Sequence, residues 1–211
     1  MKYVVLEDFL PEEQAEALAE VINRTQNYRY AYKTFEDELP KVFTGSSKDK
    51  PLRDKEESKL KQSLVEGHFT YRQKRVVEHR DCFCRYCSFV EDTLKSQDFI
   101  EYIEALGDAE DLELLKHFAS IYDVGDFLSI HPDPNYDVAF IFNLSKDWRY
   151  EYGGCLTIFD EGVPKVILPK FNSLVLMYLG EGGIDHYVSE VSRLAPHPRI
   201  AISGWYNRNS S

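Results

Sequence analysis

Short apolar runs alternate with turn-forming residues through the second half of the chain. Gly, Pro, Asn and Asp separate the runs, and this punctuation is typical of short strands joined by tight turns. The runs are Leu114 to Tyr122, Phe127 to Ile130, Asp137 to Leu144, Cys155 to Phe159, Val166 to Leu168, Ser173 to Leu179, His186 to Val191, and Ile200 to Tyr206. The pattern predicts a β-sandwich or a barrel.

The first half carries mainly helical signals. Residues 3–9 predict a short strand, and Pro11 with the acids after it suits the start of a helix. Apolar residues then recur at helical spacing and should face the core: Ala15, Leu18, Val21 and Ile22. Residues 88–106 predict one or two helices that end near Gly107.

Residues 33–58 are polar and contain Pro40, Gly45 and Pro51, which predicts a long loop with little secondary structure. A substrate lid and a surface insert are both compatible with such a loop. The chain should therefore form one domain over residues 1–211, mainly β with flanking helices (α+β). In that domain, N-terminal helical support (about 1–110) buttresses a β-core (about 111–207).

Composition narrows the class of protein. The 211 residues are 43% hydrophobic and 29% charged, with a net charge of −11. An acidic chain lacks the broad basic surface that nucleic-acid binding requires. No apolar run is long enough to cross a membrane, and the start lacks the apolar stretch of a secretory signal. We expect a cytoplasmic protein with neither a nucleic-acid nor a membrane partner.

The four cysteines are expected to be reduced thiols in a chain too large to need disulfides. Three of them lie close together with a histidine: His79, Cys82, Cys84 and Cys87. Such a cluster could bind zinc, but Cys-x-Cys-x-x-Cys is not a standard zinc spacing. A simpler interpretation of the cluster is a set of reduced thiols packed at the start of a helix. The fourth cysteine, Cys155, should face the core.

One group of residues has the pattern of a metal site. His131 and Asp133 follow a predicted strand and are two positions apart, so their side chains can share one face. With His186, they complete the two-histidine, one-carboxylate set that holds non-haem Fe(II) and leaves positions open. Arg199 could bind a dicarboxylate by paired hydrogen bonds. Each residue alone also fits an ordinary turn or surface position; the order and spacing of all of them carry the prediction.

Roughly half of the chain, residues 114–207, resembles the prolyl-hydroxylase branch of the Fe(II)/2-oxoglutarate dioxygenases. The similar segments, in order, are Tyr122 to Leu128 leading into the first histidine, Phe142 to Trp148, Gly153 to Leu156, Pro169 to Val175, and Arg199 to Tyr206. Several segments in the right order are far more specific than His-x-Asp alone. The spacer from His186 to Arg199 contains Pro196 and Pro198 and is expected to form one hairpin.

The resemblance implies a double-stranded β-helix (jelly-roll, cupin-like) core. It implies that His131, Asp133 and His186 bind Fe(II) as the catalytic centre. Arg199 would grip the far carboxylate of 2-oxoglutarate, assisted by Tyr122 and Ser203, while Trp205 would line the pocket. Asn143 stands where some members carry a tyrosine beside the cosubstrate.

The implied function is hydroxylation of a C–H bond, foremost in a prolyl residue of a protein or peptide, with release of succinate and CO2. Ascorbate is a candidate reductant. Three alternatives stay open: a hydroxylase of a free amino acid or small metabolite, a non-catalytic β-barrel binding module, and a cupin-like metal enzyme without a cosubstrate.

Overall fold

The computed structural model describes residues 2–76, 84–107 and 109–209. The strands are β1 (Tyr3–Leu6), β2 (Tyr28–Lys33), β3 (Lys41–Phe43), β4 (Tyr71–Val76), β5 (Leu112–Tyr122), β6 (Phe127–His131), β7 (Val138–Asn143), β8 (Leu156–Asp160), β9 (Val163–Ile167), β10 (Ser173–Tyr178), β11 (His186–Val188) and β12 (Arg199–Arg208). The helical segments are α1 (Glu12–Arg24), α2 (Lys50–Val65), α3 (Arg85–Phe89), η1 (Val90–Leu94), α4 (Gln97–Gly107) and η2 (Tyr150–Tyr152). Among these residues, no helix is both long and apolar enough to cross a bilayer.

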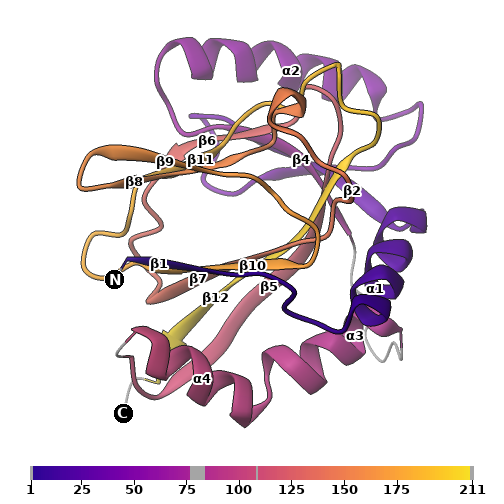
Figure 1. The fold of residues 1–211 in the computed structure, drawn as a ribbon. Coiled ribbons are helices and arrows are strands. Elements are labelled where there is room, and N and C mark those ends of the chain that lie inside the picture. Colours follow the sequence, from indigo (N-terminus) through magenta and orange to yellow (C-terminus); the bar gives the residue numbers. More distant parts are fainter. Residues whose placement is uncertain (1, 77–83, 108, 210–211) are drawn as a thin grey trace.

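The strands form one antiparallel sheet that curls into two facing layers (Figure 1). The first layer has the order β1-β10-β7-β12-β5, and the second has the order β6-β11-β8-β9. Strand β4 joins the layers, because it pairs with β5 at one end and with β6 at the other. The predicted fold class, a mainly β protein with flanking helices and a double-stranded β-helix core, is confirmed.

Strand β7 shows why the apolar runs are continuous rather than alternating. All six of its residues are buried. Val138, Phe140 and Phe142 belong to the core under the helices, whereas Ala139 and Ile141 belong to the core between the two layers. A strand covered on both faces reads as an unbroken apolar run.

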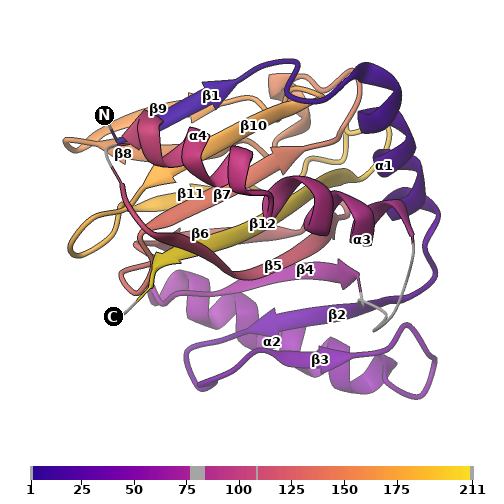
Figure 2. The same ribbon diagram turned by 90° about the horizontal axis from the view of Figure 1, so that it is seen from below.

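Helices α1, α3 and α4 cover the outer face of the first layer (Figure 2). Ala15, Leu18 and Ile22 of α1 are buried as predicted, whereas Val21 is only half-buried. A buried Leu or Ile side chain contributes roughly 1.5–3 kcal/mol, so this apolar stripe fixes the helix on the sheet. On η1, the carbonyl oxygen of Leu94 accepts a hydrogen bond of 2.8 Å from the Tyr206 hydroxyl of β12. Because these helices pack on the outer face of the first layer, they do not fill the space between the two layers.

The prediction of a long loop over residues 33–58 is wrong. Strand β3 and most of α2 lie in this segment, and Pro51 occupies the first turn of α2, where proline is well tolerated. The helix has little apolar character because only one face is covered, with Leu60 the buried apolar residue on it. Its polar composition marks a solvated helix, which the sequence pattern could not separate from a loop.

Residues before 110 also contribute four strands beside the expected helices. Strand β2, which carries Tyr28, Tyr30 and Tyr32, pairs on both sides, with β3 and β4, so these tyrosines belong to ordinary sheet packing. The expected hairpin between His186 and Arg199 is wrong. Strand β11 pairs with β6 and β8, and β12 pairs with β5 and β7. The chain therefore crosses from one layer to the other, carrying both residues to the same interior.

His79 and Cys82 lie outside the described residues, so the proposed zinc cluster is not tested as a whole. Of its other members, Cys84 precedes α3 and Cys87 lies within it. Their sulfur atoms are 3.5 Å apart in a hydrogen bond, without a disulfide. Cys155 is buried, as predicted.

Candidate metal centre

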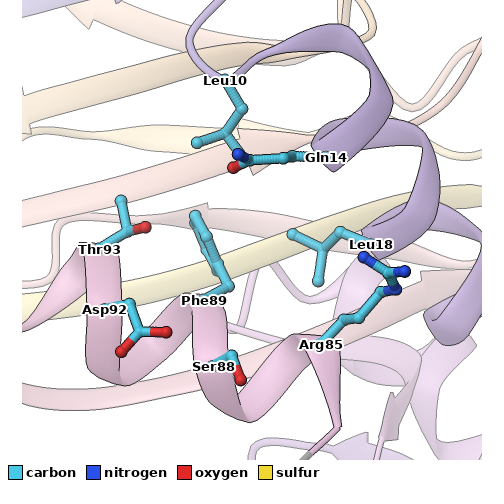
Figure 3. A pocket seen from close by; sticks show the side chains of 8 residues that line it. All are labelled: Leu10, Gln14, Leu18, Arg85, Ser88, Phe89, Asp92 and Thr93. Carbon is cyan, nitrogen blue, oxygen red and sulfur yellow. The ribbon is translucent and has the colours of Figure 1, made fainter.

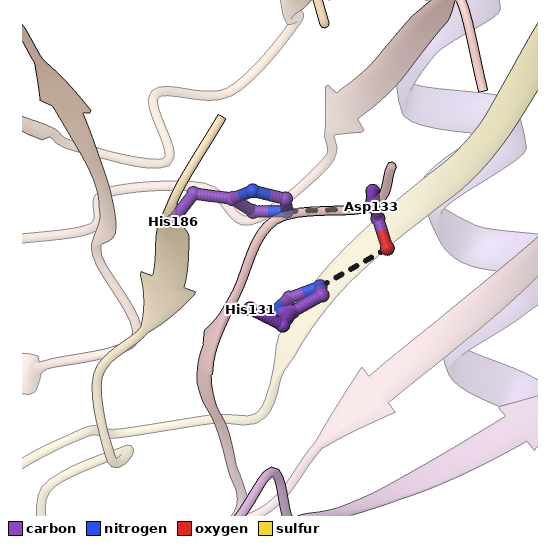
Figure 4. A group of neighbouring side chains, drawn as sticks. All are labelled: His131, Asp133 and His186. Atoms are coloured by element: carbon purple, nitrogen blue, oxygen red, sulfur yellow. Dashed lines mark ion pairs between the residues drawn. The ribbon is translucent and has the colours of Figure 1, made fainter. Parts of the chain in front are cut away.

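Two histidines and one aspartate converge at the end of the second layer (Figure 4). His131 ends β6 and His186 begins β11, and the two residues face each other in register. Nε2 of His131 lies 3.6 Å from Oδ1 of Asp133, and Nε2 of His186 lies 3.7 Å from Oδ2. The three ligand atoms are all within 4.8 Å of one another. They can therefore reach one metal ion.

Hydrogen bonds present both imidazoles in the form that binds metal. Nδ1 of His131 lies 2.9 Å from the carbonyl oxygen of Ser129, and Nδ1 of His186 lies 2.7 Å from that of Ile184. A carbonyl only accepts, so each Nδ1 carries the proton and each Nε2 keeps its lone pair toward the aspartate. Burial, together with the neighbouring His186, lowers the pKa of His131 to about 4. This imidazole is neutral at pH 7, as a metal ligand must be.

The carboxylate is held in place by its own contacts. The backbone of Asp133 has a positive φ of 53°, so its side chain turns back toward the histidines. The indole Nε1–H of Trp205 donates a hydrogen bond of 2.9 Å to Oδ2 of Asp133. Partners of this kind orient metal ligands and raise metal affinity.

The loop before His186 packs tightly against the His-x-Asp turn. Gly183 has a φ of 77°, and a Cβ there would lie 1.9 Å from the carbonyl oxygen of Pro132. The same oxygen accepts a hydrogen bond of 2.9 Å from the backbone N–H of Ile184. Only glycine allows this approach, which brings the two histidine-bearing segments together.

A cavity opens beside the three ligands. Arg199 lies in its wall with 1% of its surface exposed. Its Nη2 donates a hydrogen bond of 3.2 Å to Oδ1 of Asn143, and its guanidinium lies 5.0 Å from the ring centre of Tyr122. Its Nε has no hydrogen-bond partner, and no carboxylate of a described residue pairs with it. The cavity thus contains a buried cation that lacks an anion.

The residues fit both an iron ion and a dicarboxylate. Two neutral imidazoles and one carboxylate are a donor set suited to Fe(II), with positions left open. Burial lowers the pKa of Arg199 and raises that of Tyr122 to about 12, so the guanidinium is costly to keep charged and the phenol stays protonated. An anion that accepts hydrogen bonds from both would remove this cost.

All of the site residues predicted from the sequence border this one cavity: His131, Asp133, His186, Arg199, Tyr122 and Ser203. Sequence reasoning did not identify Gln73 of β4, which also lines it, nor the role of Asn143 as the partner of Arg199. Alternation along a strand could place Gln73 on an inner face, but no spacing rule ties it to the metal ligands.

A different pocket lies between α1 and the segment formed by α3 and η1 (Figure 3). Its polar residues include Gln14, Arg85 and Asp92, and it contains none of the three metal-ligand candidates. This pocket is therefore separate from the predicted metal site.

The site combines two imidazoles, one carboxylate and a buried arginine between two curled β-layers. This combination is typical of non-haem iron oxygenases. Residues 117–207 match the sequence model of the 2OG-Fe(II) oxygenase superfamily. This segment therefore has the sequence of a 2OG-Fe(II) oxygenase domain, and Fe(II) and 2-oxoglutarate are the cofactor and cosubstrate of that superfamily. No curated protein matches the sequence.

Solved structures share the fold over nearly the whole chain. A prolyl-4-hydroxylase from Pseudomonas putida is 17% identical with a TM-score of 0.59, and the match covers 99% of this chain and 93% of that one. A prolyl hydroxylase from Trichoplax adhaerens, solved with a hypoxia-inducible-factor peptide fragment, is 16% identical with a TM-score of 0.63, covering 98% and 83%. A viral collagen prolyl hydroxylase from Paramecium Bursaria Chlorella virus-1 is 11% identical with a TM-score of 0.56, covering 99% and 97%. The fold is prolyl-hydroxylase-like.

Proposed function

We propose that this dioxygenase hydroxylates a prolyl residue of a protein or peptide. The iron would be held by His131, Asp133 and His186, and 2-oxoglutarate by Arg199, Tyr122 and Ser203. The observation that carries the assignment of these roles is the convergence of three metal-binding atoms with an anion-free arginine in one cavity. The prolyl substrate is supported by the names of the structural neighbours, one of which was solved with a peptide.

When bound, Fe(II) and 2-oxoglutarate supply the oxidation: O2 places one oxygen atom in the C–H bond and the other in succinate, as CO2 leaves. The chain orients the participants. Arg199 would neutralise the far carboxylate of the cosubstrate, and the Tyr122 hydroxyl would donate a hydrogen bond to it. Trp205 holds the metal-binding carboxylate in its orientation. Buried apolar side chains in the same wall, among them Ile141 and Met177, keep water from the reacting carbon.

A route for the peptide is suggested by a groove next to the cavity. Leu64 at the end of α2 and His68 after it line this groove, together with Leu128 and Val188, which also border the metal cavity. Phe69 then stacks on the ring of His131 at 4.6 Å between centroids. The end of α2 and the residues after it therefore form one wall of this groove, and a substrate lid over residues 33–58 stays a prediction.

Succinate formation tests the function directly. The enzyme with Fe(II), 2-oxoglutarate and O2 should release succinate in step with a gain of one oxygen atom on proline-containing peptides, read by mass spectrometry. Asp133→Ala should abolish both signals. Hydroxylation of free proline without that of peptides would identify a small-molecule hydroxylase instead. Absence of succinate with every substrate would support the binding-module alternative.

A further inference from the structure

Two basic side chains lie at the rim of the metal cavity, on adjacent strands of the inner wall. Arg75 of β4 pairs in register with Ser120 of β5, and Lys116 lies farther along β5, opposite Trp205 of β12. Strand side chains alternate between faces, so Lys116 and Ser120 point to the same side. Neither basic residue lines the cavity itself, but each packs on an aromatic ring that does.

Arg75 is held firmly without an acidic partner. Its guanidinium lies 4.2 Å from the ring centre of Phe118, which lines the cavity, and its Nη2 donates a hydrogen bond of 2.8 Å to the hydroxyl of Tyr71. Its Nε is buried and has no hydrogen-bond partner. Within the described part of the chain, no carboxylate pairs with it. A guanidinium fixed in this way retains donors for an arriving anion.

Lys116 is the second cation of the rim. Its Nζ lies 5.9 Å from the ring centre of Trp205, and it forms no ion pair with any described residue. Burial and the nearby Arg75 both lower its pKa, while Asp133 raises it. The two cations thus repel each other next to the metal-binding carboxylate, and an anion between them would relieve that repulsion.

Gln73 supplies a third group that lacks a partner. It lies two residues before Arg75 on β4 and therefore on the same face. Only 2% of its surface is exposed, it lines the cavity, and its Oε1 has no hydrogen-bond donor. A buried amide oxygen without a donor is unfavourable by about 1–3 kcal/mol, so this atom is suited to accept an N–H from a bound molecule.

We propose that Gln73, Arg75 and Lys116 form a substrate subsite that binds a carboxylate beside the carbon to be hydroxylated. This inference rests on the proposed function and specifies its substrate class. The carboxylate comes from an acidic residue next to the proline, or is the α-carboxylate of a free or C-terminal proline. Gln73 accepts an N–H of the same substrate. The chain carries a net charge of −11, so binding of a further acidic group is favoured only where cationic side chains lie close together, as Arg75 and Lys116 do.

Matched peptides test the subsite without altering the enzyme. Blocked pentapeptides acetyl-Ala-Ala-Pro-Asp-Ala-amide and acetyl-Ala-Asp-Pro-Ala-Ala-amide are compared with their Asn counterparts, which have the same shape without the charge. Free proline and acetyl-Ala-Ala-Ala-Ala-Pro with a free C-terminus supply the α-carboxylate. At least one carboxylate form should have a KM about tenfold below that of its neutral counterpart, since a hydrogen bond to a charged group contributes about 1.5–3 kcal/mol.

Charge-removing variants then locate the effect. Arg75→Gln and Lys116→Gln should each bring the ratio of KM values between the neutral and the carboxylate peptides close to one. Lys165→Gln, at an exposed position of β9 that does not line the cavity, makes the same change of charge and should keep the preference. Peptide affinity is also measured by calorimetry on the enzyme loaded with Mn(II) and 2-oxoglutarate without O2, which reads binding apart from turnover.

The outcomes separate the two proposals. If no proline compound is hydroxylated but the Asp peptides bind more tightly than the Asn peptides, the proposed reaction fails and the subsite stands. If hydroxylation proceeds with equal KM and equal affinity for charged and neutral forms, the subsite is refuted. A preference that survives in both rim variants would also overturn it.

Discussion

Replacement of Arg199 by methionine separates its role in the cosubstrate site from any role in folding. Methionine keeps much of the length of the side chain and removes the charge. The arginine is 1% exposed, its Nε lacks a partner, and its hydrogen bond to Asn143 is the one polar side-chain contact that the structure shows. Without an anion it is a buried unpaired cation, which a folded protein holds at a cost in free energy.

The structure therefore predicts that Arg199→Met does not destabilise the protein without 2-oxoglutarate but weakens the binding of 2-oxoglutarate. In the absence of 2-oxoglutarate, Arg199→Met should not lower the free energy of unfolding and should raise it by up to about 3 kcal/mol, because an uncompensated buried charge is removed. Loss of one partner of a buried charge pair weakens binding by about 2–5 kcal/mol. The Kd for 2-oxoglutarate should accordingly rise about 30-fold or more.

Urea unfolding with Mn(II), with and without 2-oxoglutarate, measures both effects in one experiment. At a concentration 100 times the wild-type Kd, the cosubstrate should stabilise the wild type by about 2.7 kcal/mol and the variant by about 0.9 kcal/mol or less. Arg193→Met is the matched control, since Arg193 is exposed on the loop before β12. An Arg199→Met protein that is strongly destabilised, yet gains as much from 2-oxoglutarate as the wild type, would refute this account.

Three further changes probe the metal-binding residues. Gly183→Ala should be about 1–3 kcal/mol less stable than Gly182→Ala in urea, because both glycines have positive φ but only the former would place its Cβ against a carbonyl oxygen of the adjacent turn; equal losses would contradict this. Trp205→Phe removes the N–H donor to Asp133 and should weaken Mn(II) binding about 10- to 100-fold in a direct titration, so an unchanged affinity would exclude the orienting role. The pKa of His131 is about 4 in the fold against an ordinary value of 6.5, so from pH 7 to pH 5 the unfolded chain binds a proton that the folded chain does not. Between pH 7 and pH 5, the free energy of unfolding of the metal-free wild type should then fall by about 2 kcal/mol more than that of His131→Asn. Equal decreases in the two proteins would show that the pKa of His131 is not lowered by the fold.

The sequence predicted the strands well where burial leaves a clear signal. Strand β7 is covered on both faces and appears as an unbroken apolar run, and β12 ends its run near the predicted position. The failures lie where the pattern is ambiguous. Helix α2 is largely solvated, so its composition resembles that of a loop. The segment from β11 to β12 contains prolines typical of a turn, and no local signal shows that it changes layers.

The ligand set could be predicted because metal chemistry restricts residue types as well as spacing. The environment of Arg199 could not, because it arises from strands that are distant in sequence. Asn143 precedes Arg199 by 56 positions and reaches it only through the pairing of β7 with β12. The absence of a carboxylate around the guanidinium is a property of the assembled interior, as is the unpartnered oxygen of Gln73. Buried polar groups are normally paired. The unpartnered Nε of Arg199 and Oε1 of Gln73 are therefore the strongest indication that the cavity binds a molecule other than the chain itself.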